Sequence, residues 1–453
     1  MSWRKQKEHS CGVCRTPAPP DRPAYHHYGY QEIQLFLRFV LQANQSLRGA
    51  AKTMQILLQP MPSLSGAPTA NCGRTWLLRL GLHELQRALP QSDDVAWIVD
   101  HTVQIGTQKC FVILSVCLSQ LDRYCPELTE LDVVAIEPVE QSNADIVERQ
   151  LLAATERTGQ PRMIVSDGCR ELKRGIAQFQ ERSPNTLAVS DIQHKAALLL
   201  KKALEGDDRW AEFNKMLNKT RQATQPSDLA HLAPVAQKTK ARYMNMGPVL
   251  KWSEKMLAYL ACPFSASPPE PLEVGPINIH FKWLQEYRED IAEWNKQIEI
   301  LEVAAEQCRR QGYHRELATN LRARLEAIST GERSRKIAAA MLEFIEEQGA
   351  MARPGERLLP TSEALESLFS RYKHIAKQQS NSGFTSLVLA MAACVTTPTR
   401  SVIEQALSAV RTVDVIEWAR EQIGATVQAK RRNTLGKTKV GTNPAQEPNL
   451  ATG

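Results

Sequence analysis

Two aspartates stand at the ends of apolar runs, where their carboxylates could do chemistry. Asp100 ends the run VAWIVD (95–100) and Asp167 ends the run RMIVSD (162–167). Such runs predict strands covered on both faces, and ligand sites gather at the carboxyl ends of strands of this kind. Two negative charges in one crevice repel each other unless a divalent cation lies between them, and oxygen ligands favour Mg2+ or Mn2+. The pair therefore predicts a metal-dependent site.

Each aspartate taken alone also has an ordinary structural explanation. An Asp at the end of a strand often forms a turn or caps a helix, and Asp167 is followed by Gly168. The sequence leaves this alternative open for both residues. The chain contains no P-loop and no G-x-G-x-x-G motif, which argues against an ATPase or a nicotinamide-dependent enzyme.

The surrounding pattern predicts the sheet that would position the two aspartates. Helical periodicity alternates with the later apolar runs in the order β-β-β-α-β-α-β-α, and long helical stretches then fill most of 205–360. We therefore expect an α/β fold, a mixed β-sheet between layers of helices, interrupted by a large all-helical insertion. The other predicted strands are 110–118, 131–139 and 186–191.

The stretch before the sheet has the pattern of a small helical region. Ser46 is a good N-cap for the helix LRGAAKTMQILL, and a second helix, TANCGRTWLLRLGL, follows a loop rich in Pro and Ser. This order is typical of a helix-turn-helix DNA reader, although many small helical domains share it. The candidate DNA contacts on these helices are Arg48, Lys52, Arg74 and Arg79.

The charge of the chain is basic at both ends. The net charge is +7, residues 1–90 contain 11 Lys/Arg against 4 Asp/Glu, and residues 428–453 contain 5 Lys/Arg with Glu447 as the single acid. Basic ends suggest an anionic polymer as partner, whereas solubility alone is the simpler alternative. No run of 18 apolar residues occurs, so the sequence predicts no membrane span.

The predicted strand order and the positions of the acids resemble the RNase H-like catalytic core of DDE transposases and retroviral-type integrases. In that family the third acid comes from a later helix, and SEALESLFSRYK resembles the late motif of transposases from bacterial insertion sequences and, more loosely, the hAT group. The match implies Glu366 as the third acid, with Glu363 as the alternative one helical turn away. The long helical stretch between Asp167 and Glu366 is similar to the insertion of hAT-like transposases.

The segment SDIQHKAALLLKKAL is also similar to a recurring element of these transposases. The resemblance implies that Asp191 and His194 lie near the active cleft as accessory residues, and that Lys201 and Lys202 lie near the DNA backbone. A capping Asp and a packed His are the structural alternatives.

The resemblance implies a transposase that cuts and joins DNA with two Mg2+ or Mn2+ ions held by Asp100, Asp167 and Glu366. The partners would be double-stranded DNA, namely transposon terminal repeats and target, bound by a homodimer or larger assembly in a bacterial cytoplasm. A transposase-derived DNA-binding regulator and a metal-dependent nuclease remain alternatives. The expected parts are a flexible basic arm (1–28), a helix-turn-helix-type region (29–90), the first core part (93–205), the helical insertion (206–358), the second core part (359–425) and a disordered basic tail (426–453).

Two further sets of residues have less certain roles. Cys11 and Cys14, with His9 before them, could bind zinc, but the second ligand pair lacks the usual spacing, so a flexible arm with incidental cysteines is the preferred interpretation. Three tryptophans of the insertion are expected to pack in the core rather than to stack on bases. They are Trp252, Trp283 and Trp294.

Overall fold

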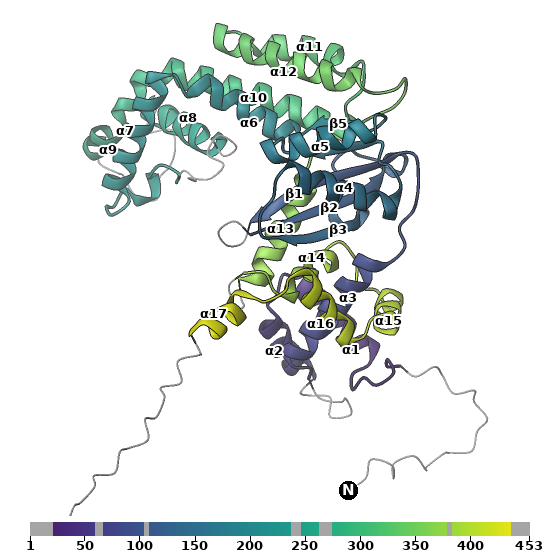
Figure 1. The fold of residues 1–453 in the computed structure, drawn as a ribbon. Helices are drawn as coiled ribbons and strands as arrows, with labels where there is room; N and C mark the ends of the chain where they lie inside the picture. Colours follow the sequence, from purple (N-terminus) through teal and green to yellow (C-terminus); the bar gives the residue numbers. More distant parts are fainter. Residues whose placement is uncertain are drawn as a thin grey trace, which may run out of the picture.

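The computed structural model consists of one mixed sheet with helical parts at both ends (Figure 1). It describes residues 21–58, 67–103, 108–236, 246–261, 274–377 and 383–435. The predicted zinc ligands Cys11 and Cys14 lie outside these residues. None of the described helices combines the length and apolar character needed to cross a membrane.

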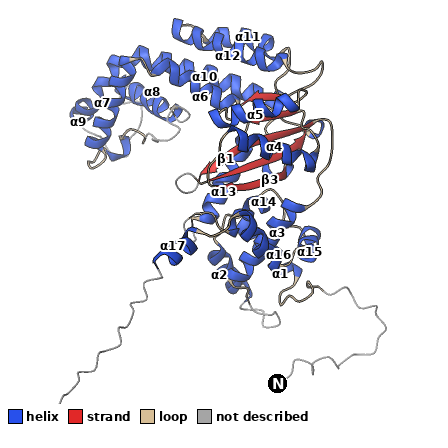
Figure 2. Ribbon diagram, viewed as in Figure 1, coloured by secondary structure: helices blue, strands red, loops and turns tan. Residues whose placement is uncertain are grey.

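The sheet has five strands in the order β3-β2-β1-β4-β5 (Figure 2). The pairs β1–β2 and β2–β3 are antiparallel, whereas β1–β4 and β4–β5 are parallel. All five strands coincide with the predicted apolar runs, because runs of Val, Ile and Leu suit strands that are covered on both faces. The strands are β1 (Val95–Val103), β2 (Lys109–Cys117), β3 (Asp132–Val139), β4 (Met163–Ser166) and β5 (Leu187–Ser190).

Two separate cores cover the two faces of the sheet. Because side chains alternate along a strand, Trp97 and Val99 of β1 pack with one core, and Ala96 and Ile98 pack with the other. The first core contains apolar side chains of α4 (Ala144–Thr158) and α5 (Arg170–Arg182), which connect the last strands. The second core continues into the helices at both ends of the sheet.

The helices that precede the sheet form one unit with the last helices of the chain. Helix α3 (Ala70–Gln86) packs against α1 (Tyr30–Leu41) and α2 (Leu47–Leu58), and also against α14 (Ala390–Ala393) and α15 (Arg400–Ala409). Gly81 permits a close approach of the two backbones, since a Cβ there would lie 2.0 Å from the carbonyl oxygen of Leu389. This terminal helical unit also includes η6 (Ser386–Leu389) and α16 (Thr412–Gln422).

In its described residues the insertion between β5 and the return to the sheet consists mainly of helices, with one isolated β-bridge between Tyr313 and Leu358 (Figure 1). Helix α6 (Ile192–Leu204) leads into it and packs against α10 (Arg288–Gln311) and α12 (Glu332–Ala350). The predicted core role of the three tryptophans is confirmed, because Trp294 is fully buried and Trp252 and Trp283 pack against the core. The remaining helices are α7 (Asp208–Thr224), α8 (Gly247–Ala261), α9 (Val274–Phe281) and α11 (Leu317–Ile328).

Residues near both ends of the chain form more structure than the sequence predicts. Residues 21–28 were assigned to a flexible arm, but Tyr28 packs edge-on against Trp76 and its hydroxyl donates to the carbonyl of Ala67. At the other end α17 (Val427–Leu435) occupies the start of the predicted disordered tail, and Thr426 caps it by accepting the Ala429 amide. An ST-type cap and a short run of good helix formers account for this helix.

Candidate active site

The parallel strands place Asp100 and Asp167 next to each other. In the register of the sheet Val99 of β1 pairs with Ser166 of β4, and Ser166 pairs with Ser190 of β5. The residues that follow this row are Asp100, Asp167 and Asp191. Because neighbouring strands lie about 4.8 Å apart, three aspartates from distant parts of the chain meet at one edge of the sheet.

Strand alternation also puts these aspartates on the same face. Asp100 is two residues after Ile98, and Asp167 is two residues after Val165. Ile98 and Val165 belong to the core that also contains Leu365 of helix α13 (Glu363–Ala376), and α13 contacts β1. The aspartates therefore point to the face that α13 covers.

Helix α13 carries both candidates for the third acid, and they have different surroundings. Glu363 is bound by Arg309 of α10, at 2.9 Å from Nη1 to Oε1, and it accepts a hydrogen bond from the thiol of Cys125 at 3.3 Å. Glu366 is exposed, and it interacts electrostatically with His194, Asp191 and Asp167. Glu363 thus has structural partners on another element, and Glu366 is the acid on the side of the aspartates.

The pKa shifts of the acids at this edge of the sheet agree with a cluster of like charges. Burial raises the pKa of Asp100 to about 7, and repulsion from Asp167 and Glu366 adds to this increase. Partial desolvation by the neighbouring groups also raises the pKa of Glu366, although the residue is exposed by surface area, against the opposing effect of His194. A cation that neutralises the cluster would stabilise the charged form of a carboxyl group in such a place.

Asp191 and His194 form a pair beside the three acids. Asp191 is 2% exposed, and its Oδ1 lies 3.4 Å from Nδ1 of His194. Contact with Asp191 raises the pKa of His194 to about 9, with further contributions from Asp167 and Glu366. This shift favours the protonated imidazole at neutral pH, on the side of the cluster that is otherwise negative.

The donor set suits a divalent cation, but its side chains are not arranged as metal ligands. Oδ1 of Asp100 accepts the amide of His101 at 2.6 Å, and Oδ1 of Asp167 accepts the amide of Cys169 at 2.9 Å. Across the described part of the chain, no group of three or more His, Cys, Asp or Glu side chains is placed so that it could hold a metal ion. Carboxylates on adjacent strands fit Mg2+ by their chemistry, and these two hydrogen bonds leave Oδ2 of each aspartate for an ion.

Four of the six candidate DNA-contacting residues are exposed, while the other two are engaged inside the terminal helical unit. Arg79 is 7% exposed, and its guanidinium donates to the carbonyls of Val410 and Leu407 at 2.6 Å each. Nη2 of Arg74 donates to Oγ of Ser386 at 2.9 Å. The exposed residues are Arg48 and Lys52 on α2 and Lys201 and Lys202 on α6.

The packing of α3 does not favour the predicted role of this segment as a DNA-reading helix. A reading helix must present a free face to the groove, whereas most of α3 is covered by helices from both ends of the chain. The sequence alone predicts a short helix after a loop rich in Pro and Ser, as in a helix-turn-helix reader. The partners that bury its second side, α14 and α15, lie more than 300 positions further along the chain, as the separation of 312 between Arg74 and Ser386 illustrates.

Sequence reasoning did not single out the residues that hold the start of α13. Thr361 and Ser362 contact the buried carboxylate of Asp191, and Arg309 pairs with Glu363. The only local signal was the Thr-Ser pair in TSEALE directly before the helix, which is typical of a capping segment.

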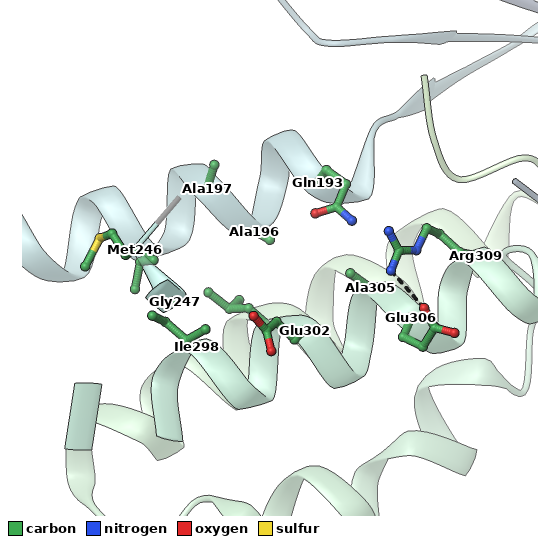
Figure 3. A pocket seen from close by; sticks show the side chains of 12 residues that line it. Gln193, Ala196, Ala197, Met246, Gly247, Ile298, Glu302, Ala305, Glu306 and Arg309 are labelled. Atoms are coloured by element: carbon green, nitrogen blue, oxygen red, sulfur yellow. Dashed lines mark hydrogen bonds and ion pairs between the residues drawn. The ribbon is translucent and has the colours of Figure 1, made fainter. Parts of the chain in front are cut away.

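A groove between α6 and α10 lies in the insertion and includes none of the three acids (Figure 3). Its volume is about 470 Å³, and Gln193 lines it on one helix, with Glu302 and Glu306 on the other. Arg309, which pairs with Glu306 in this view, also holds Glu363. The groove therefore ends at the contact between the insertion and α13.

Comparisons with known proteins find little. No model of a known protein family matches the chain. No curated protein matches its sequence. Among solved structures, one similar chain is from the Drosophila P element transposase strand transfer complex, at 10% identity and a TM-score of 0.41, covering 84% of this chain and 94% of that one. A TM-score of this size does not establish a common fold, and the matched chain is not from a bacterial insertion sequence.

Proposed function

We propose that the chain is a DDE-type transposase, a polynucleotidyl transferase that binds transposon ends, cleaves DNA strands and joins them to target DNA. The observation that carries this proposal is the meeting of Asp100 and Asp167 on adjacent parallel strands, on the face where α13 presents Glu366. A mixed sheet of three antiparallel strands followed by two parallel ones supports the RNase H-like interpretation of the core.

Asp100, Asp167 and Glu366 would hold two Mg2+ or Mn2+ ions. Bound ions of this kind supply an activated oxygen nucleophile and stabilise the leaving oxygen of a phosphodiester. The raised pKa of Asp100 means that this carboxyl group gives up a proton when a cation is bound near neutral pH. Glu363 is not part of this set, because Arg309 and Cys125 already bind it.

The other polar residues of the edge would act on the DNA rather than on the ions. The protonated His194 would attract the phosphate that approaches the carboxylates. Lys201 and Lys202 follow on the same helix and are exposed, as are Arg48 and Lys52 on α2, so these residues would contact the DNA backbone. We leave Arg74 and Arg79 out of this interface because their guanidinium groups bind inside the terminal helical unit.

The proposal is tested with double-stranded oligonucleotides that carry the ends of the DNA flanking the reading frame, together with a supercoiled plasmid as target. We expect Mg2+- or Mn2+-dependent strand cleavage, followed by joining of the cleaved 3′ end to the plasmid. Glu366→Gln should reduce cleavage by roughly 100-fold or more. Glu363→Gln tests the alternative acid one turn away and should reduce cleavage far less, because it loosens the contact of α13 with Arg309 but removes no proposed metal ligand.

The outcomes separate the alternatives. Cleavage without joining would favour a metal-dependent nuclease. Binding to the ends without cleavage, in the presence of Mg2+ or Mn2+, would favour a regulator. Loss of cleavage in Glu363→Gln with activity retained in Glu366→Gln would exchange the roles of the two glutamates. A homodimer or larger assembly on paired ends would appear as a complex of that mass with the oligonucleotide.

A further inference from the structure

Asp191 connects two segments that are far apart in the chain. Its Oδ1 accepts the amide of His194 at 2.9 Å, which caps the start of α6. Its Oδ2 accepts the amide of Ser362 at 2.5 Å and the hydroxyls of Ser362 and Thr361 at 2.8 and 3.3 Å, directly before α13. One buried carboxylate therefore serves the helix that leaves the sheet for the insertion and the helix that returns from it.

A backbone contact reinforces the same junction. The amide of Ile192 donates to the carbonyl of Pro360 at 2.9 Å, and the amide of Asp191 donates to the carbonyl of Ser166 at 3.2 Å. The junction is thus joined to β4, the strand that ends immediately before Asp167. The insertion, although long, is closed at its base by residues of the sheet edge.

We infer that Asp191 is a positioning residue that clamps the two ends of the insertion together and so fixes the first turn of α13, with Glu366, beside Asp100 and Asp167. The role of Glu366 as a ligand rests on the proposed function, whereas the clamp follows from the geometry of Asp191 alone. It differs from an accessory role of Asp191 in contacting DNA, since the side chain is 2% exposed and its oxygens are occupied within the protein.

The carboxylate is required because both of its oxygens accept hydrogen bonds. An Asn at this position offers one acceptor oxygen and a donating NH2 group, so it would satisfy either the amide of His194 or that of Ser362 and oppose the other. A Glu is one methylene longer and would not fit a site that is buried among these partners. Asp191→Asn is therefore the variant that weakens the link between the two ends of the insertion while changing the shape of the side chain least.

Hydrogen exchange followed by mass spectrometry of the full-length chain tests the clamp without any measurement of activity. In Asp191→Asn we expect exchange at the start of α6 and at residues 361–366 to rise by roughly 10- to 100-fold, while the β-strands stay protected. Asp207→Asn is the matched control, because Asp207 caps α7 within the insertion by accepting the amides of Arg209 and Trp210. Because Asp207 also binds Arg333 of α12 through Oδ2, that control should affect exchange at α7 and α12 at most, and it should leave residues 361–366 at the wild-type rate.

A milder substitution keeps the test informative if the Asp191→Asn chain does not fold. Ser362→Ala removes one hydroxyl from Oδ2 and leaves the rest of the clamp in place. It should raise exchange at residues 361–366 and leave the start of α6 unchanged. Wild-type exchange at 361–366 in both variants, or a rise in Asp191→Asn that is confined to α6, would overturn the inference.

Mn2+ binding measured by electron paramagnetic resonance tests whether the clamp acts through Glu366. Asp191→Asn should weaken Mn2+ binding by about 10- to 100-fold. The double variant with Glu366→Gln should bind no more weakly than Glu366→Gln alone, since the clamp then has no ligand to position. Additive losses would mean that Asp191 acts elsewhere and would overturn the inference. If the wild-type chain binds no Mn2+ and cleaves no DNA, the proposed function fails, and the exchange data alone decide whether Asp191 is a clamp.

Discussion

The guanidinium of Arg79 and the carboxylate of Asp100 are both largely removed from water, but their partners differ. Arg79 lies in the terminal helical unit, where the carbonyls of Val410 and Leu407 accept from it at 2.6 Å. Asp100 lies at the edge of the sheet, where Asp167 and Glu366 oppose its charge and His194 favours it. The first charge is matched by the protein itself, whereas the second meets a repulsion that His194 only partly offsets. This difference separates a residue that stabilises the fold from residues that form a site.

The largest expected effect comes from replacing Asp100, whose charge is repelled by the neighbouring acids. Asp100→Asn should reduce Mg2+-dependent cleavage by roughly 100-fold or more. The same variant should be more stable than the wild-type chain in EDTA at neutral to alkaline pH, by roughly 2 °C or more in Tm. If Asp100→Asn lost activity and also had a lower Tm than the wild-type chain, the contrast between Asp100 and Arg79 would be wrong.

The pH dependence of this gain follows from the direction of the pKa shift. Burial and Asp167 raise the pKa of Asp100 from 3.8 to about 7, so the folded state holds a proton that the unfolded state has already lost. The wild-type chain therefore loses stability as pH rises from 3.8 to about 7, and the Asn variant does not. Thermal melts across this range should show an advantage of Asp100→Asn that grows with pH and levels off above about 7.

The next largest effect is expected from replacing Arg79, whose buried guanidinium is bound by backbone carbonyls. Arg79→Leu removes the donors that bind the carbonyls of Val410 and Leu407, so those oxygens stay buried without their partners. We expect the free energy of unfolding to fall by about 3 kcal/mol, measured by urea denaturation. The exposed Arg38 on α1 is the control, and Arg38→Ala should cost less than about 1 kcal/mol. A mild effect of Arg79→Leu, combined with weaker DNA binding, would return Arg79 to the DNA interface.

A smaller effect is expected at His194, where a cation faces the acids. Contact with Asp191 raises the pKa of His194 from 6.5 to about 9. The stability that this pair contributes is present below 6.5 and is lost as pH rises through about 9. The difference in urea midpoint between the wild-type chain and His194→Gln should therefore shrink between these two values. A constant difference across that range would show that the imidazole is not charged in the folded state.

The smallest expected effect concerns the exposed cations. Lys202→Ala should weaken DNA binding uniformly across sequences and lower the slope of log K against log salt by about 1. Lys219 on α7 is an exposed lysine that we do not place in the interface, and its Ala variant should keep the slope. An unchanged slope for Lys202→Ala would remove α6 from the DNA backbone.

Local sequence patterns were sufficient for the strands and for the two aspartates at the sheet edge. All five strands follow from continuous apolar runs, and Asp100 and Asp167 stand at positions that a register of parallel strands brings together. The cap at Ser46 is confirmed, since its Oγ accepts the amide of Gly49. These features depend on residues that are neighbours in the sequence or on the two-residue period of a strand.

Patterns could not predict contacts between distant segments. The burial of Arg79 depends on residues near 410, and the second partner of Asp191 is 171 positions away. Each of these side chains looks locally like something else: Arg79 like an exposed helix residue and Asp191 like a simple N-cap. Hydrogen-bond partners that come from another part of the chain leave no periodicity to detect.

The close approach of α3 to Leu389 has a consequence for how the protein is made. Helices α1 to α3 leave the ribosome before the sheet, whereas α14 and α15, which cover α3, follow about 300 residues later. The apolar side chains of α3 that these later segments cover therefore stay without those partners while the sheet and the insertion are synthesised, a state that favours aggregation or capture by chaperones. A nascent chain that stops before residue 390 keeps its strands and its carboxylates but leaves the N-terminal helices uncovered.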